Sequence, residues 1–198
     1  MNRKDWVGNN KSVYSTLGAS NHSLENREIN DFYATDPEAI VHLLGLEKFS
    51  NKIWEPACGK GHLSHFMELK GYEVRSTDLI DRGYGQGGID FLAVNEPWNG
   101  DIITNPPYIL ASEFIIKAMQ LIPNGNKIAM FLKLQFLEGK ERKKLFKQYP
   151  PKVVYVSSSR INCAKNGEFE KSSSSAIAYG WFLWEKGFTG EPVIRWFN

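Results

Sequence analysis

A short apolar run that ends in Asn105-Pro106-Pro107-Tyr108 contains the residue types best suited to chemistry in this sequence. Each proline fixes its own φ and biases the residue before it towards extended backbone, so we expect a rigid rim at the carboxyl end of a strand. The side-chain oxygen of Asn105 and the carbonyl of Pro106 can each accept one N–H of an exocyclic aromatic amine. Such a nitrogen is a weak nucleophile because its lone pair is delocalised into the ring. Two rigid acceptors would draw it towards tetrahedral geometry and direct the lone pair at a sulfonium methyl group, while Tyr108 offers a flat face on which a flipped base can stack.

A turn with two glycines lies upstream of this motif, between a predicted strand and a predicted helix. Gly59 and Gly61 let the backbone turn sharply and approach a ligand closely. Asp78 ends the next predicted strand, 17 residues after Gly61, where a carboxylate can accept both hydroxyls of a ribose. Glu55 places an acid where a dinucleotide site would need a glycine for the pyrophosphate. The turn therefore suits S-adenosylmethionine, a cationic nucleoside, better than an anionic dinucleotide; the structural alternative is a helix-opening turn with an incidental acid.

Strands and helices are predicted to alternate through the middle of the chain. Strands are expected over 52–56, 72–77, 101–105, 127–132 and 153–157. Helices are expected from Asp36-Pro37 and over 61–70, 110–122 and 138–149. This alternation favours a parallel sheet covered on both faces. The apolar segment 176–184 has no helix before it, which predicts a terminal antiparallel strand, and 193–197 is a further candidate edge strand.

The bulk composition is that of a globular α/β protein. The chain has 198 residues, of which 42% are hydrophobic, and its net charge is +2. We expect a flexible N-terminal arm over 1–28 and a single domain over 29–198. No apolar run approaches the roughly 20 residues that span a bilayer, and the start has no secretory pattern. Two cysteines are too few for a disulfide framework, so a cytoplasmic protein is expected.

Positive charge is concentrated between Lys133 and Lys165. This stretch holds nine lysines and arginines against two glutamates. Concentrated positive charge attracts a phosphate backbone, although a solvated helix face would give the same pattern. The candidate nucleic-acid contacts are Lys133, Arg160 and Lys165. The four histidines lack metal-ligand spacing, so no metal site is expected.

Together these motifs resemble the N6-adenine-specific DNA methyltransferases, in particular the small phage and prophage Dam-like members, over roughly 30–184. The resemblance implies a Rossmann-like class I methyltransferase fold with a mostly parallel, seven-stranded-type sheet, an antiparallel C-terminal strand and helices on both faces. It also implies S-adenosylmethionine as cofactor, DNA as partner and adenine methylation by base flipping. Asp90-Phe91 resembles the pair that brackets the cofactor adenine. The stretch from Phe32 to Pro37 is similar to the element that closes over the cofactor's methionine end.

The residues that the motifs and the resemblance assign fall into two groups. The catalytic residues are expected to be Asn105, Pro106, Pro107 and Tyr108. The cofactor-binding residues are expected to be Phe32, Tyr33, Thr35, Glu55, Ala57, Cys58, Gly59, Gly61, Asp78, Leu79, Asp90 and Phe91. Of these, Cys58 is expected to be a small packing residue and not a nucleophile.

The sequence departs from the family pattern at the start of the tetrapeptide and in the extra residues between Tyr33 and Pro37, and it leaves several acceptors open. The tetrapeptide begins with Asn105, whereas aspartate is commoner in this class. Asn-Pro-Pro-Tyr also occurs in RNA adenine methyltransferases, guanine-N2 methyltransferases and enzymes that methylate a protein glutamine. RNA is therefore the alternative nucleic-acid substrate, followed by a protein glutamine. A non-catalytic binding module that kept the fold is an alternative of a different class. The sequence shows no separate target-recognition domain.

Overall fold

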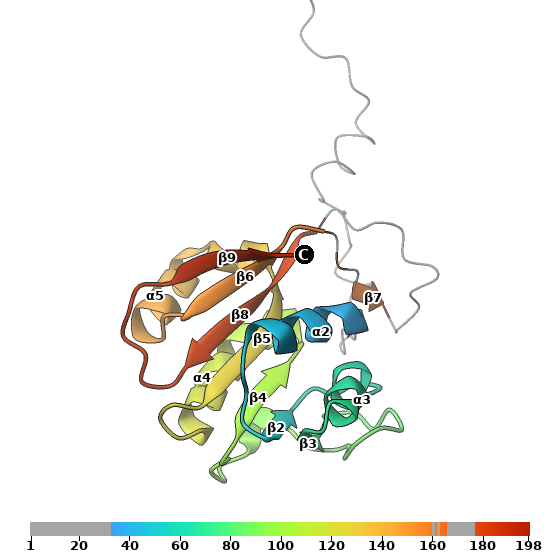
Figure 1. The fold of residues 1–198 in the computed structure, drawn as a ribbon. Helices are drawn as coiled ribbons and strands as arrows, with labels where there is room; N and C mark the ends of the chain where they lie inside the picture. The colour runs from blue at the N-terminus through green and yellow to red at the C-terminus, as the bar shows by residue number, and fades with distance from the viewer. Residues whose placement is uncertain (1–32, 160, 162, 166–176) are drawn as a thin grey trace, which may run out of the picture.

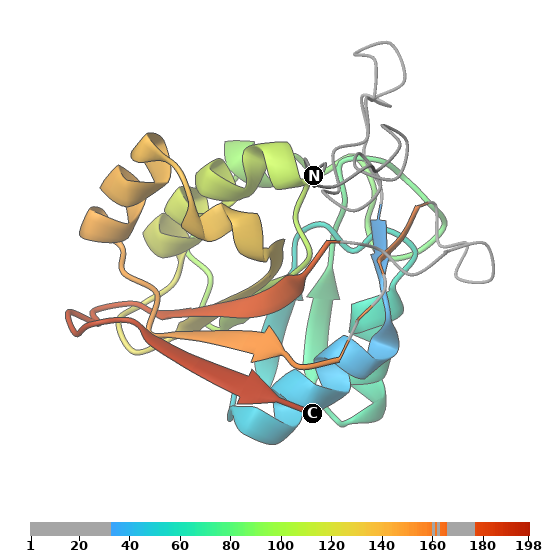
Figure 2. The same cartoon turned by 90° about the horizontal axis from the view of Figure 1, so that it is seen from above.

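The predicted alternation of strands and helices forms a seven-stranded sheet between two helical layers (Figures 1 and 2). The computed structural model describes residues 33–159, 161, 163–165 and 177–198; the predicted arm over 1–28 lies outside them. The strands are β2 (Lys52–Glu55), β3 (Glu73–Ser76), β4 (Asp101–Thr104), β5 (Lys127–Lys133), β6 (Val153–Ser157), β8 (Tyr179–Glu185) and β9 (Val193–Phe197). Their order in the sheet is β3-β2-β4-β5-β8-β6-β9.

The expected fold class is confirmed, with one difference in the place of the antiparallel strand. Strand β8 is antiparallel to both β5 and β6 and lies between them, inside the sheet, while β9 runs parallel to β6 and forms the edge. The physical reason is the composition of β8. Its tryptophans Trp181 and Trp184 point to opposite faces and are both fully buried. The strand therefore needs cover on both faces, which a position inside the sheet provides. In β9, by contrast, Val193 and Ile194 are exposed, as an edge position permits.

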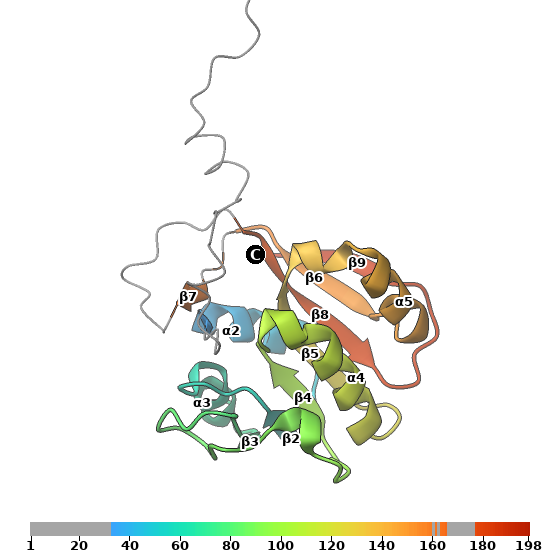
Figure 3. The ribbon, with the colours of Figure 1, turned by 180° about the vertical axis from the view of Figure 1, so that it is seen from behind.

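Helices cover both faces of the sheet, as predicted. One face carries α2 (Pro37–Leu46) and α3 (His62–Leu69), and the other carries α4 (Ala111–Leu121) and α5 (Lys140–Gln148), as Figures 1 and 3 show from opposite sides. Adjacent residues of a strand feed the two separate cores: Ile102 packs with α4 and Ile103 packs with α2 and α3. This period of two buries every strand of the sheet's centre on both faces.

Helix α2 begins where the sequence predicts. Asp36 is its N-cap and accepts a hydrogen bond from the backbone N–H of Glu38 at 3.0 Å, and Pro37 occupies the first turn. Proline is tolerated there because that backbone position needs no hydrogen-bond donor. For the seven strands of the main sheet and for the α-helices, the bounds that the sequence predicts differ from the observed ones by at most three residues. None of the described helices is long and apolar enough to cross a membrane.

A second, two-stranded sheet was not predicted. Strand β1 (Tyr33–Thr35) pairs antiparallel with β7 (Cys163–Lys165), so Thr35 lies opposite Cys163. Each strand has only three residues, which gives no readable alternation in the sequence. The pairing brings a segment before the first helix beside one that follows β6.

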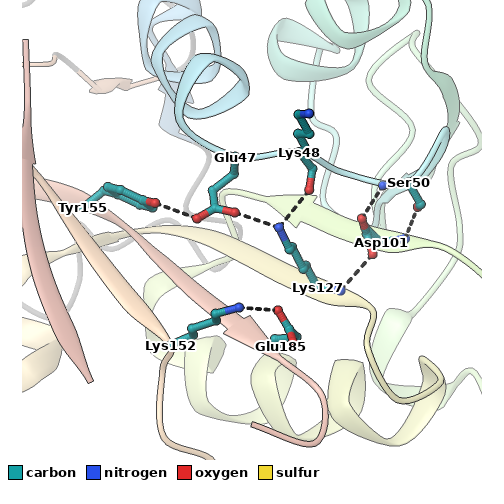
Figure 4. A network of polar contacts seen from close by, with 8 residues as sticks. All are labelled: Glu47, Lys48, Ser50, Asp101, Lys127, Lys152, Tyr155 and Glu185. Carbon is teal, nitrogen blue, oxygen red and sulfur yellow. Dashed lines mark hydrogen bonds and ion pairs between the residues drawn. The ribbon is translucent and has the colours of Figure 1, made fainter. Parts of the chain in front are cut away.

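The amino ends of the central strands are closed by a polar network (Figure 4). The carboxylate of Glu47 accepts hydrogen bonds from Lys127 at 2.7 Å and from the Tyr155 hydroxyl at 2.6 Å. Burial acts to raise the pKa of Glu47, but the hydrogen bonds from Lys127 and Tyr155 outweigh it and lower the pKa below its ordinary value. Asp101 accepts from the backbone N–H groups of Ser50 and Lys127. These charged groups bond to one another, so we assign the network at this end of the sheet a role in stabilising the fold.

Candidate active site

The opposite end of the sheet contains a cleft, at the point where the chain changes direction across the sheet. From β2 the chain adds β3 on one side and later β4 on the other. Open α/β sheets bind ligands at such a switch, outside the carboxyl ends of the strands. The cleft has a volume of about 150 Å³. It brings together residues from both predicted motifs: Thr35, Glu55, Ala57, Cys58, Asp78, Leu79, Asp90, Phe91, Asn105, Pro106, Pro107 and Tyr108.

The glycine turn after β2 is held against Asp78, which follows β3, by a hydrogen bond to the Asp78 carboxylate. The Gly59 N–H donates to one carboxylate oxygen of Asp78 at 2.8 Å, and the Ile80 N–H donates to the other at 2.9 Å. Gly61 has φ +81°, and a Cβ there would lie 2.4 Å from the ring of Tyr84. The positive φ favours glycine at Gly61, and a side chain there would displace the Tyr84 ring. Neither glycine lines the cleft; their part is to shape the turn that does.

Glu55, the last residue of β2, is buried at the base of the cleft and is only 2% exposed. The Ser64 hydroxyl donates to its carboxylate, and the Ser76 hydroxyl donates to Ser64 at 2.6 Å. Burial raises the pKa of Glu55 to about 8, against the opposing effect of the Ser64 hydrogen bond and with a contribution from Asp78. Before any ligand binds, this carboxyl therefore holds its proton at neutral pH.

Asp90 and Phe91 lie at the same cleft, on the loop between β3 and β4. The Asp90 carboxylate accepts from the Leu92 N–H at 2.9 Å and caps the short 3-10 helix η2 (Phe91–Ala93). Phe91 is buried and packs against Trp54 and Phe114, with ring centroids 5.1 and 4.9 Å away. Its ring is therefore a fixed wall of the cleft.

The tetrapeptide leaves β4 at the mouth of the cleft. The Asn105 side-chain Nδ2 donates to the hydroxyl of Thr35 at 2.8 Å, although the two residues are 70 positions apart. Tyr108 opens the 3-10 helix η3 (Tyr108–Leu110). The ammonium of Lys133 lies 4.6 Å from the centre of the Tyr108 ring, and the Tyr179 ring lies 6.0 Å away. Cation–π and ring contacts hold the tyrosine in place.

The remaining predicted residues are distributed as follows. Lys133 contacts Tyr108 and does not line the cleft. Phe32 and Arg160 lie outside the described residues, and only the backbone of Tyr33 and Lys165, paired between β1 and β7, is described. Burial, together with Glu55 and Asp78, raises the pKa of the Cys58 thiol to about 12, which makes this residue a poor nucleophile.

Several residues of the cleft were missed by sequence reasoning. They are Pro56, His62, Leu63, Ile80, Arg82, Ile89, Leu92, Ile109, Leu110 and Phe114. His62 could have been found because it directly follows the glycine turn; burial and the nearby Lys60 lower its pKa. Arg82 and Ile89 lie on an irregular loop with no pattern that marks them. Among the described residues, no group of three or more histidines, cysteines or carboxylates could hold a metal ion.

The comparisons with known proteins agree with this architecture. Protein-family models give no match to the sequence, and neither do curated protein sequences. A type I restriction-modification methyltransferase subunit from Streptococcus thermophilus has a similar structure, with a TM-score of 0.58, 13% identity, and coverage of 84% of this chain and 47% of that one. A protein from Listeria monocytogenes described as a class I S-adenosylmethionine-dependent methyltransferase has a TM-score of 0.55 and 15% identity, with coverage of 91% of this chain and 69% of that one. A predicted O-methyltransferase from Agrobacterium tumefaciens has a TM-score of 0.53 and 14% identity, with coverage of 73% of this chain and 78% of that one.

The protein has the class I methyltransferase fold. At 11–15% identity these likenesses establish the fold alone. The chain spans about half the length of two type I modification subunits that it resembles, 48% and 47%. Within this methyltransferase fold the cleft lies between the glycine turn and the tetrapeptide, so both predicted motifs face one space.

Proposed function

We propose that the protein transfers a methyl group from S-adenosylmethionine to the N6 amine of adenine in DNA. The observation that supports this most is the shared cleft. Asn105-Pro106-Pro107-Tyr108 lines one part of it, and Glu55, Asp78 and Asp90 line another. Acceptors suited to an aromatic amine thus face carboxyl groups suited to a cationic nucleoside.

The residues of the glycine-turn side fit S-adenosylmethionine. Asp78 is fixed by two backbone N–H groups and would accept the ribose hydroxyls. Asp90 would accept the amino group of the cofactor adenine, against the packed ring of Phe91. The carboxyl of Glu55 would face the amino-acid end, where ionisation becomes favourable beside a cation. When bound, the cofactor supplies the electrophilic methyl group.

The residues of the tetrapeptide side would hold and activate the target amine. The Asn105 side-chain oxygen and the Pro106 carbonyl each accept one N–H, and the Tyr108 ring stacks on the flipped base. Positive charge develops on the nitrogen as the N–C bond forms, and both acceptors stabilise it. The electron pair of the sulfur–methyl bond that breaks would stay with the bound cofactor, and one proton would then pass from the nitrogen to water. Lys133, whose ammonium lies 4.6 Å from the centre of the Tyr108 ring, would contact a DNA phosphate.

The test is transfer of tritiated methyl from S-adenosylmethionine to unmethylated duplex DNA. Wild type is compared with Asn105→Ala and with Asn51→Ala, an exposed asparagine on a surface loop. We expect label in N6-methyladenine for wild type and Asn51→Ala, and a loss of at least about 100-fold for Asn105→Ala, since it removes an acceptor that acts in the transition state.

The same assay separates the alternatives. Label on structured RNA and none on DNA would identify an RNA methyltransferase, and label that resists nuclease digestion would identify a protein acceptor. Cofactor binding without turnover on any acceptor would indicate a binding module. We also propose that the protein acts in the cytoplasm. Residues 29–198 would form one methyltransferase domain.

A further inference from the structure

Thr35 has a contact that neither its sequence position nor the proposed cofactor site explains. Its hydroxyl accepts the side-chain N–H of Asn105 at 2.8 Å. Thr35 is only 2% exposed and belongs to the lining of the cleft. A part-buried hydrogen bond of this length is well formed. It joins a strand that precedes the first helix to the first residue of the tetrapeptide.

The position of Thr35 is determined by the two-stranded sheet. Thr35 is the last residue of β1 and pairs with Cys163 of β7. Directly after it, Asp36 caps α2, whose residues Ala39, Ile40 and Leu43 are fully buried in the core. The hydroxyl oxygen is thus held from both sides by backbone structure, at the position where it accepts the Asn105 N–H.

In this structure the Thr35 hydroxyl accepts from Nδ2 of Asn105, which leaves the oxygen end of the amide for a substrate. Asparagine carries a donor group and an acceptor oxygen on the same carbon. If the amide turned over, it would direct N–H groups at the N–H groups of the target amine, and the two would repel. With Nδ2 donating to Thr35, the oxygen Oδ1 is the end that faces away from β1.

We propose that Thr35 is a positioning residue, which orients the Asn105 amide so that its oxygen accepts the target N–H. The kinetic part of this inference rests on the proposed function, but the contact itself can be tested without turnover. Losing the hydroxyl removes this hydrogen bond from the part-buried amide of Asn105. The orienting effect of one such bond corresponds to about a tenfold change in kcat.

The experiment compares Thr35→Val, Thr35→Ser and Thr104→Val. Valine keeps the shape of threonine without the hydroxyl, whereas serine keeps the hydroxyl. Thr104 is the matched control because it is also buried, adjoins Asn105 in the chain, and its hydroxyl has no hydrogen-bond partner within the described part of the chain. We expect Thr35→Val to lower kcat about tenfold, with the KM for DNA and the cofactor Kd within about twofold of wild type. Thr35→Ser and Thr104→Val should behave as wild type.

The second readout is the side-chain amide signal of Asn105 in a ¹H–¹⁵N correlation spectrum, identified by its loss in Asn105→Ala. We expect a protected, shifted N–H in wild type and Thr35→Ser, and its shift towards the solvent-exposed position in Thr35→Val. An unchanged amide signal in Thr35→Val would overturn the inference, and so would a weaker cofactor Kd with unchanged kcat. If wild type methylates no acceptor, the spectrum still decides whether the hydroxyl holds the amide. Should Thr35→Val fail to fold, Thr35→Ala against Thr35→Ser isolates the hydroxyl in the same two readouts.

Discussion

The buried carboxyl of Glu55 should make the stability of the protein fall as the pH rises through neutrality. Its pKa is raised from the ordinary 4.5 to about 8, chiefly by burial. The folded state therefore binds this proton more tightly than the unfolded state. The resulting stabilisation is fully present below pH 4.5 and is lost progressively as the pH rises towards 8.

The size of the effect follows from the two pKa values. Linkage predicts a loss of about 2.5 kcal/mol in the free energy of unfolding between pH 5 and pH 7, and about 1 kcal/mol more by pH 8. Glu55→Gln keeps a neutral acceptor for the Ser64 hydroxyl and cannot ionise, so it should lack this fall. The difference in the free energy of unfolding between wild type and Glu55→Gln, taken at each pH, isolates the effect of Glu55, because the other titrating groups are common to both proteins.

The assay is urea unfolding of wild type, Glu55→Gln and Glu73→Gln at several pH values from 5 to 8. Glu73 is an exposed glutamate, and its substitution controls for the exchange of a carboxyl for an amide at a site that is not buried. Parallel pH profiles for wild type and Glu55→Gln would refute the reasoning, since they would mean that Glu55 is already ionised at pH 7. Calorimetry in buffers of different protonation enthalpy adds a check: at pH 7, S-adenosylmethionine should release up to about 0.9 proton on binding, because the ligand cation favours the carboxylate.

Three further predictions concern the glycine turn, the tyrosine clamp and the far end of the sheet. Gly61→Ala should lower stability by about 2 kcal/mol and weaken cofactor binding in calorimetry, because its Cβ would lie 2.4 Å from a ring carbon; Gly71→Ala, at φ +89° with open space, should lose stability but keep cofactor affinity. Lys133→Met should raise the KM for DNA several-fold in methyl-transfer kinetics, because it removes the cation over Tyr108; an unchanged KM would contradict the DNA-side role. Glu47→Gln should cost about 2 kcal/mol in urea unfolding at pH 7 because it leaves a half-buried lysine without its partner. Since the pKa of Glu47 is lowered, that cost should shrink as the pH falls below the ordinary range of glutamate; a cost that does not depend on pH would contradict this.

Local patterns in the sequence were sufficient for the order of elements and for the two motifs. The proline pair ends β4 because Pro106 and Pro107 cannot continue a ladder of backbone hydrogen bonds. The glycines turn the chain after β2 because Gly61 adopts φ +81°. These effects act within a few residues, so they can be read before the fold is known. The shared cleft then follows from the rule that parallel strands place their carboxyl ends at one edge.

The place of β8, the pairing of β1 with β7 and the Thr35–Asn105 hydrogen bond were decided by the tertiary structure alone. Strand β8 pairs with β5 and β6, and only the competition among strands for buried neighbours puts it inside the sheet. Thr35 and Asn105 are 70 residues apart, and nothing local to either predicts the other. Contacts of this kind depend on the simultaneous positions of distant segments, which packing around a common core determines. The sequence by itself determined which groups could do the chemistry, and the tertiary structure decided how the asparagine amide among them is oriented.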